Sequence, residues 1–94
     1  MTEKIDIENV NVPGQVTRVD AAKYRAMHDA MMAVMSQAPM TAKEIKDAAK
    51  PHLPDDLFPA GATSGWWAKT VQLDLEAKGQ LIRHATKPLS WSKP

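Results

Sequence analysis

SGWWAKTVQLDLEAKG, from Ser64 to Gly79, is the stretch of sequence that decides the fold. Its main apolar residues recur at helical spacing and form one stripe: Trp67, Val71 and Leu75. Ser64 is a candidate N-cap, and Gly79 is typical of the position just after a helix end. We therefore expect a helix that runs to Lys78 and buries Trp67 in the core.

A longer helix is predicted earlier in the chain, over residues 21–36. Asp20 is its candidate N-cap, because an Asp carboxylate accepts hydrogen bonds from the unpaired N–H groups of a first turn. Its apolar stripe is formed by Tyr24, Met27, Met31, Val34 and Met35. Pro39 prevents the helix from continuing, and we expect the Met-rich stripe to fill a core.

A short helix between these two begins at a capping box. Thr41 and Glu44 have the spacing at which each side chain satisfies the backbone N–H of the other. Pro51 disfavours the α conformation at Lys50, so we expect the helix to end there. A Pro-punctuated connection, residues 51–63, follows it. The residues expected to face inward from the helix and the connection are Ile45, Ala48, Ala49, Leu57 and Phe58.

Two short strands are predicted after Gly79, at Leu81–His84 and Leu89–Trp91, with residues 86–88 as the tip between them. Residues 39–41 are a candidate third strand. The order helix, strand, helix, helix, hairpin is that of a winged helix-turn-helix. We therefore predict an α+β, mainly α, winged helix-turn-helix fold over residues 20–94, with three helices and a C-terminal β-hairpin wing. The alternative is a plain three-helix domain with an irregular tail.

Residues 1–19 are predicted to form an extended N-terminal arm whose first few residues are disordered. Apolar and polar residues alternate along it. Pro13-Gly14 favours a type II turn, which splays strands, so we expect no hairpin. An apolar arm cannot offset its loss of backbone entropy without a surface to pack on. We therefore expect Val10–Val19 to dock on its own domain or on a symmetry-related copy.

The composition indicates one small domain. Ninety-four residues leave room for a single modest core. The absence of cysteine excludes a disulfide scaffold, a cysteine-rich zinc site and a thiol nucleophile. No apolar run is long enough to span a membrane, and the acidic N-terminus lacks the apolar core of a secretory signal. We expect a cytoplasmic location.

Positive charge is concentrated in the C-terminal third of the chain. The formal net charge of the whole sequence is only +1, but residues 59–94 carry five basic and two acidic residues, a net charge of +3. We therefore expect any electrostatic footprint for an anionic partner to lie in this third.

Five residues in that third are candidates for contacts with double-stranded DNA. Lys69 and Gln72 would lie on the polar strip of the helix 64–78, where such side chains can meet base edges. Arg83, His84 and Lys87 would lie on the wing and grip phosphates. The alternative is that they form an ordinary solvated surface, because acidic residues on the same helix cancel its charge.

A second face of the same helix is also apolar. Trp66 lies about 100° from Trp67 around a helix, on the side of Leu73. Either the arm or the hairpin covers this face, or the face is an exposed patch for a homodimer or another protein. Nucleic-acid binding and protein interaction are therefore the two alternative functions.

No catalytic, cofactor or metal site is predicted. The three histidines, His28, His52 and His84, fall on different elements without the spacing of metal ligands. The chain has no Gly-rich phosphate loop and no Ser or Thr with an identifiable base. We expect a binding module and not an enzyme.

The block GWWAKTVQLDLEAKG, residues 65–79, resembles the signature of a small uncharacterised bacterial family. Residues 55–59, DDLFP, and residues 87–91, KPLSW, are similar to that family too, and the resemblance covers roughly residues 10–92. It implies a winged-helix-like fold and a bacterial source, and it implies no activity. A looser similarity, to winged domains at the start of some restriction-system proteins, differs in the Trp-to-Gly spacing.

Overall fold

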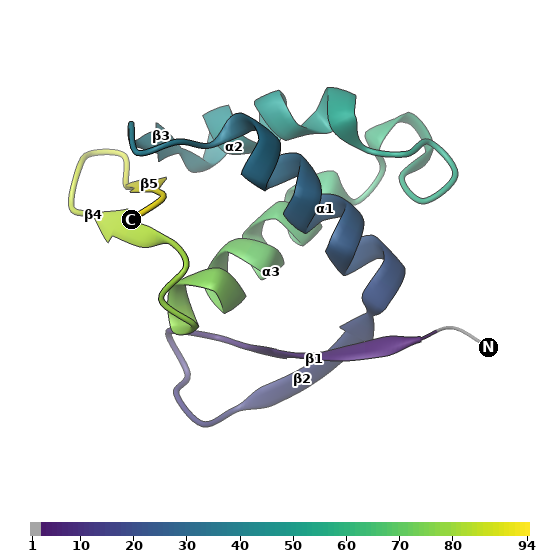
Figure 1. Ribbon diagram of the computed structural model, residues 1–94, viewed down its shortest axis with the longest axis horizontal. Helices are drawn as coiled ribbons and strands as arrows, with labels where there is room; N and C mark the ends of the chain where they lie inside the picture. Colours follow the sequence, from purple (N-terminus) through teal and green to yellow (C-terminus); the bar gives the residue numbers. More distant parts are fainter. Residues whose placement is uncertain (1–2) are drawn as a thin grey trace.

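The computed structural model describes residues 3–94, and over this range it is an α+β structure of three α-helices and two small antiparallel sheets (Figure 1). Met1 and Thr2, for which disorder was expected, lie outside the described residues. The helices are α1 (Ala21–Val34), α2 (Ala42–Ala49) and α3 (Ser64–Ala77). The strands are β1 (Lys4–Glu8), β2 (Val16–Asp20), β3 (Met40–Thr41), β4 (Ile82–His84) and β5 (Ser90–Ser92). Short 3-10 helices, η1 (Lys50–His52) and η2 (Pro59–Gly61), lie between α2 and α3.

Local capping fixes where the first two helices begin. The Asp20 carboxylate accepts a hydrogen bond from the backbone N–H of Lys23 at 3.1 Å. Glu44 N donates to Thr41 Oγ1 at 3.2 Å, and Thr41 N donates to Glu44 Oε1 at 2.8 Å. Donation from the Thr41 backbone lowers the pKa of Glu44 below its usual range. Both predicted caps are thereby confirmed.

The third helix ends as predicted but begins differently. The N-cap is Thr63, in the left-handed region at φ 61°, and its hydroxyl donates to the Ala62 carbonyl at 2.6 Å. The prediction of Ser64 as N-cap was wrong, because Ser64 already has helical geometry and is buried. Gly79, at φ 74°, follows the helix end, and the N–H of the next residue donates to the Leu75 carbonyl at 2.8 Å. This is the pattern of a Schellman motif.

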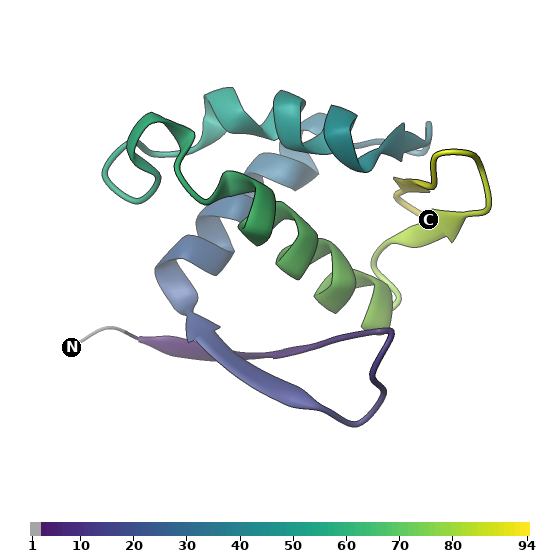
Figure 2. The same cartoon turned by 180° about the vertical axis from the view of Figure 1, so that it is seen from behind.

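The three helices enclose the core, with α1 and α3 crossing between α2 and the N-terminal strands (Figures 1 and 2). Trp67 is only 6% exposed, and its ring meets the ring of Phe58 edge-on at a centroid distance of 6.4 Å. The largest fully buried apolar side chains are Phe58, Met27, Met31, Ile45, Leu75 and Val71. The apolar stripes predicted for all three helices therefore form one core, apart from the half-buried Val34 and Ala48. Burial of each such large side chain stabilises the fold by about 1.5–3 kcal/mol.

The C-terminal strands and the short strand before α2 form one antiparallel sheet in the order β3-β5-β4. Trp91 on the central strand pairs with Met40 on one side and Arg83 on the other. The predicted strands at 39–41, 81–84 and 89–91 are confirmed within a residue or two. This sheet ties the end of the chain to the segment between α1 and α2.

The N-terminal segment forms a hairpin, which corrects the expectation of an unpaired arm. Strands β1 and β2 are antiparallel, with Ile5 opposite Val19 and Ile7 opposite Thr17. The physical reason lies in the connecting loop, residues 9–15, which makes two turns in succession: Val12 N donates to Asn9 O at 3.0 Å, and Gln15 N donates to Val12 O at 3.2 Å. Pro13-Gly14 occupies the second turn, with Gly14 at φ 87°. Because this turn lies inside a longer loop, it does not set the angle between the strands.

The hairpin packs against α1 and α3 on the opposite side of the molecule from α2 (Figures 1 and 2). Ile7 and Val19 are buried in the core. The valines nearer the loop, Val10, Val12 and Val16, are exposed. The expected docking of Val10–Val19 on its own domain is therefore confirmed at Val19, and Ile7 provides the other anchor. No helix within residues 3–94 has both the length and the apolar character that crossing a membrane requires.

Candidate nucleic-acid interface

The outer face of α3 is the element around which the candidate residues are arranged. Trp67 faces inward, whereas Trp66 and Lys69 are exposed on the other side of the helix. Lys69 lines two grooves, one between α3 and α2 and one between α3 and the N-terminal hairpin. Lys69 is therefore at the surface, as the sequence predicted, and its side chain lies between the two grooves.

Gln72 lies in a different environment from the one expected. It is only 6% exposed and lines the groove between α2 and α3. The expectation that Lys69 and Gln72 share one polar strip open to a duplex was wrong for Gln72, since α2 packs beside it. An amide recessed between two helices is poorly placed to read a base edge.

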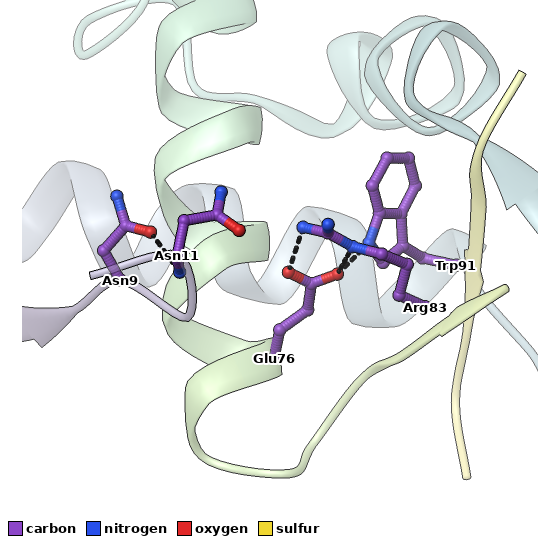
Figure 3. Close-up of polar contacts among 5 residues, drawn as sticks. All are labelled: Asn9, Asn11, Glu76, Arg83 and Trp91. Carbon is purple, nitrogen blue, oxygen red and sulfur yellow. Dashed lines mark hydrogen bonds and ion pairs between the residues drawn. The ribbon is translucent and has the colours of Figure 1, made fainter. Parts of the chain in front are cut away.

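Arg83 is held by a buried carboxylate on α3 (Figure 3). Its Nε and Nη2 each donate to a Glu76 oxygen at 2.9 Å, and the Trp91 indole N–H also donates to Glu76, whose side chain is 4% exposed. The hydrogen bond to Glu76 raises the pKa of Arg83 above its ordinary value. Asn9 and Asn11, in the loop of the N-terminal hairpin, add only neutral groups nearby. The arginine predicted to grip phosphates is therefore at the surface but paired with a buried carboxylate.

The other two wing candidates differ from each other. His84 is half-buried, and its Nε2 lies 2.8 Å from Ser92 Oγ. Lys87 is exposed in the loop between β4 and β5, and no residue in the range 3–94 forms an ion pair with it. Of the five predicted DNA contacts, Lys69 and Lys87 are the two that present an unpaired ammonium group to solvent.

The groove between α2 and α3 gathers three lysines around a volume of about 440 Å³. They are Lys43 and Lys46 of α2 and Lys69 of α3, and no acidic side chain lines the groove. Lys43 Nζ donates to Asp47, just outside, at 2.9 Å, and this bond raises the pKa of Lys43. The sequence did not lead to this site because we expected a surface for an anionic partner only within residues 59–94. The outward lysines of α2 were the available signal.

The groove between α3 and the N-terminal hairpin has a different character. It has a volume of about 320 Å³ and brings together the two residues of the predicted partner patch, Trp66 and Leu73. Trp66 is 58% exposed and meets Trp67 edge-on at a centroid distance of 4.9 Å, while Leu73 is half-buried. Glu8 of the hairpin lines the same groove. The hairpin therefore shelters Leu73 and leaves Trp66 open to solvent.

Asp74, one of the acidic residues expected to cancel the charge of the helix, is a buried carboxylate. It is fully buried and accepts hydrogen bonds from the Tyr24 hydroxyl, from Lys78 Nζ and from the backbone N–H of Glu8, the last at 2.8 Å. Burial, followed by the bond to Asp74, raises the pKa of Tyr24 above its ordinary value. The available signal was spacing, since Asp74 lies seven residues after Trp67 and three after Val71, which is the helical spacing of the buried stripe. Its role is to join α1, α3 and β1.

The buried polar groups join elements of the fold, and the exposed ones supply surface charge. Among residues 3–94, no three His, Cys, Asp or Glu side chains are grouped closely enough to hold a metal ion. The two buried carboxylates are satisfied by internal donors. What faces solvent around α3 is a lysine-lined groove, an exposed tryptophan and Lys87 on the β4–β5 loop.

Comparison with known protein families gives one match. The model of DUF6958, described as a family of unknown function, matches residues 4–91. The matched range runs from β1 to β5, so it includes the N-terminal hairpin. No curated protein matches, and no solved structure matches.

Proposed function

The chain belongs to this family of unknown function, and we propose that it is a non-catalytic module that binds double-stranded DNA. The observation that carries the proposal is the lysine-lined groove beside the outer face of α3, with no acidic side chain in its lining. Lysine ammonium groups that neutralise backbone phosphates release counterions, which supplies most of the free energy of sequence-independent DNA binding.

The order of the elements supports a winged helix-turn-helix assignment. A helix, a short strand, two helices and a hairpin follow each other, and the sheet order β3-β5-β4 places the first strand beside the last. In that fold α3 would be the recognition helix and the β4–β5 loop would be the wing. Lys69 and Lys87 would then face the same DNA duplex from the helix and from the wing.

Low sequence specificity is part of the proposal. Bases are read by groups such as amides and guanidinium ions placed at their edges. Here Gln72 is recessed, Arg83 is bound to Glu76, and His84 lies against Ser92. Lys46, Lys69 and Lys87 remain without an ion pair within residues 3–94, and lysines at a DNA surface serve mainly as phosphate contacts.

Fluorescence anisotropy with short labelled duplexes tests the proposal. The apparent affinity should fall steeply with salt, with a log–log slope that corresponds to several phosphates. Two duplexes of unrelated sequence should bind within a few-fold of each other. A flat slope, or no binding at low salt, would sink the proposal.

A second candidate function is protein interaction, either with another protein or in a homodimer. It is favoured by Trp66, a large apolar side chain that is 58% exposed beside a groove. Tryptophan is enriched among residues that dominate binding energy at protein interfaces. Sedimentation equilibrium of the parent and of Trp66→Ala tests the homodimer: self-association should be present in the parent and lost in the variant.

A cytoplasmic location and a bacterial source complete the proposal. Both rest on the sequence: the location on its composition and N-terminus, the source on its resemblance to a bacterial family.

A further inference from the structure

The Gln72 side chain carries a recessed amide without a protein partner among the described residues. It is 6% exposed, and its amide makes no hydrogen bond to any group within residues 3–94. Over the same range, no side-chain nitrogen or oxygen is sealed from solvent while lacking a partner. The Gln72 amide must therefore reach the groove between α2 and α3, which it lines. No protein group within residues 3–94 competes for this amide, so its N–H groups are free to donate to a molecule bound in the groove.

The charges around this amide indicate the chemistry of the partner. Three ammonium groups, from Lys43, Lys46 and Lys69, surround the same groove, and no carboxylate lines it. The Lys46 side chain lies close to the first turn of α3, because a Cβ atom added at Gly65 would be 3.5 Å from the Cδ atom of Lys46. Neither Lys46 nor Lys69 forms an ion pair within residues 3–94. Such a site attracts an anion that can accept several hydrogen bonds.

We propose that the α2–α3 groove seats a backbone phosphate of DNA, with the Gln72 amide donating from its recessed side and the lysine ammoniums of Lys46 and Lys69 from its rim. This inference rests on the proposed function. A backbone phosphate is favoured as the occupant because Lys69 also forms the outer crest of α3. An anion bound in the groove would therefore lie next to the face of α3 that a duplex would cover. Gln72 acts as a phosphate anchor and not as a base reader.

Two variants and one matched control test the anchor by duplex anisotropy across a salt series. Lys46→Gln should lower the log–log slope by about 1, as expected for one lost phosphate contact. Gln72→Leu should weaken binding about tenfold at constant slope, because it removes a neutral donor to a charged group. Lys4→Gln on β1, away from the groove, has the same change in charge and should leave the slope unchanged.

An NMR titration of the parent gives an independent readout. The side-chain amide signal of Gln72 should move on addition of inorganic phosphate and stay in place with chloride at matched ionic strength. Circular dichroism checks that each variant is folded. If Gln72→Leu does not fold, Lys46→Gln still tests the anchor, because Lys46 is partly exposed.

The outcomes separate the anchor from the function. If DNA binds and both groove variants behave like Lys4→Gln, the anchor is overturned and the proposed function stands. If the parent binds no DNA but Gln72 responds to phosphate, the proposed function fails and the DNA occupant is overturned in favour of a free phosphate compound. If neither probe binds, both proposals are overturned.

Discussion

The inner and outer faces of α3 carry adjacent tryptophans in opposite environments. Trp67 is 6% exposed and packs with Phe58 in the core, whereas Trp66 is 58% exposed beside the N-terminal hairpin. The core buries the inner face of α3 and leaves Trp66 and Lys69 exposed. The exposed Trp66 and Lys69, together with Gln72 in the groove beside α2, are the residues of α3 to which we assign function.

The largest effect should come from removing the inner tryptophan. Trp67→Ala should lower the free energy of unfolding by about 3–5 kcal/mol, the range for truncating a buried aromatic residue. Trp66→Ala, one position along the chain, should change it by less than about 1 kcal/mol. Urea denaturation followed by circular dichroism measures both. Equal losses of unfolding free energy would mean that Trp66 and Trp67 contribute alike to the core, which contradicts the comparison.

The buried carboxylate of α3 should give the next largest effect. Asp74→Ala leaves the Tyr24 hydroxyl, the Lys78 ammonium and the Glu8 N–H without their acceptor. We expect a loss of about 3 kcal/mol, at the lower end for a broken buried pair because Lys78 is partly exposed. Asp47→Ala removes an exposed carboxylate on α2 and should leave the urea midpoint nearly unchanged. If Asp74→Ala is equally mild, the link between β1 and the helices has been misassigned.

Releasing Arg83 of β4 from Glu76 should have a smaller effect on stability and should strengthen DNA binding. Glu76→Gln removes the charge that holds Arg83 and should cost about 1–2 kcal/mol. The freed guanidinium should strengthen DNA binding and steepen the salt slope by about 1. The double variant Glu76→Gln, Arg83→Gln should return the slope to the parent value. A slope that stays raised in the double variant would exclude Arg83 as the cause.

The parts of the fold that were predictable are those set by local chemistry. The stripe Trp67, Val71 and Leu75 repeats within one helix, and the capping box of Thr41 and Glu44 spans three residues, so neither depends on distant packing. The hairpin was missed because its loop, residues 9–15, is longer than the tight turns that sequence rules recognise. The pairing of β1 with β2 is stabilised because hairpin side chains are buried against α1 and α3. A local sequence pattern does not reveal such distant contacts.

The candidate site was less predictable because it depends on neighbours far apart in the chain. Helical spacing places Gln72 and Glu76 toward the side of α3, where burial is decided by what packs alongside. Only the docking of α2 recesses Gln72, and only the C-terminal sheet brings Arg83 and Trp91 to Glu76. Exposure of Lys69 agrees with its predicted place on the polar strip, whereas for Trp66 the sequence had left open whether the face is covered or exposed.

The smallest effect should come from Lys87 on the β4–β5 loop. It has no ion-pair partner within residues 3–94, so Lys87→Gln should leave the melting temperature unchanged. Loss of one phosphate contact should reduce the salt slope by about 1 and the affinity several-fold. Lys23→Gln on α1 is the control with the same charge change. If both variants reduce the slope alike, the net charge of the protein and not the position of Lys87 determines binding.

Mapping the bound surface by NMR tests the assignment of function to the outer face most directly. On titration with a short duplex, the backbone amide signals of Lys43, Lys46, Lys69 and Lys87 should move together and saturate at one concentration. Signals of β1 and of the inner face of α3 should stay in place. Movement centred on the N-terminal hairpin, or no movement at all, would contradict the account.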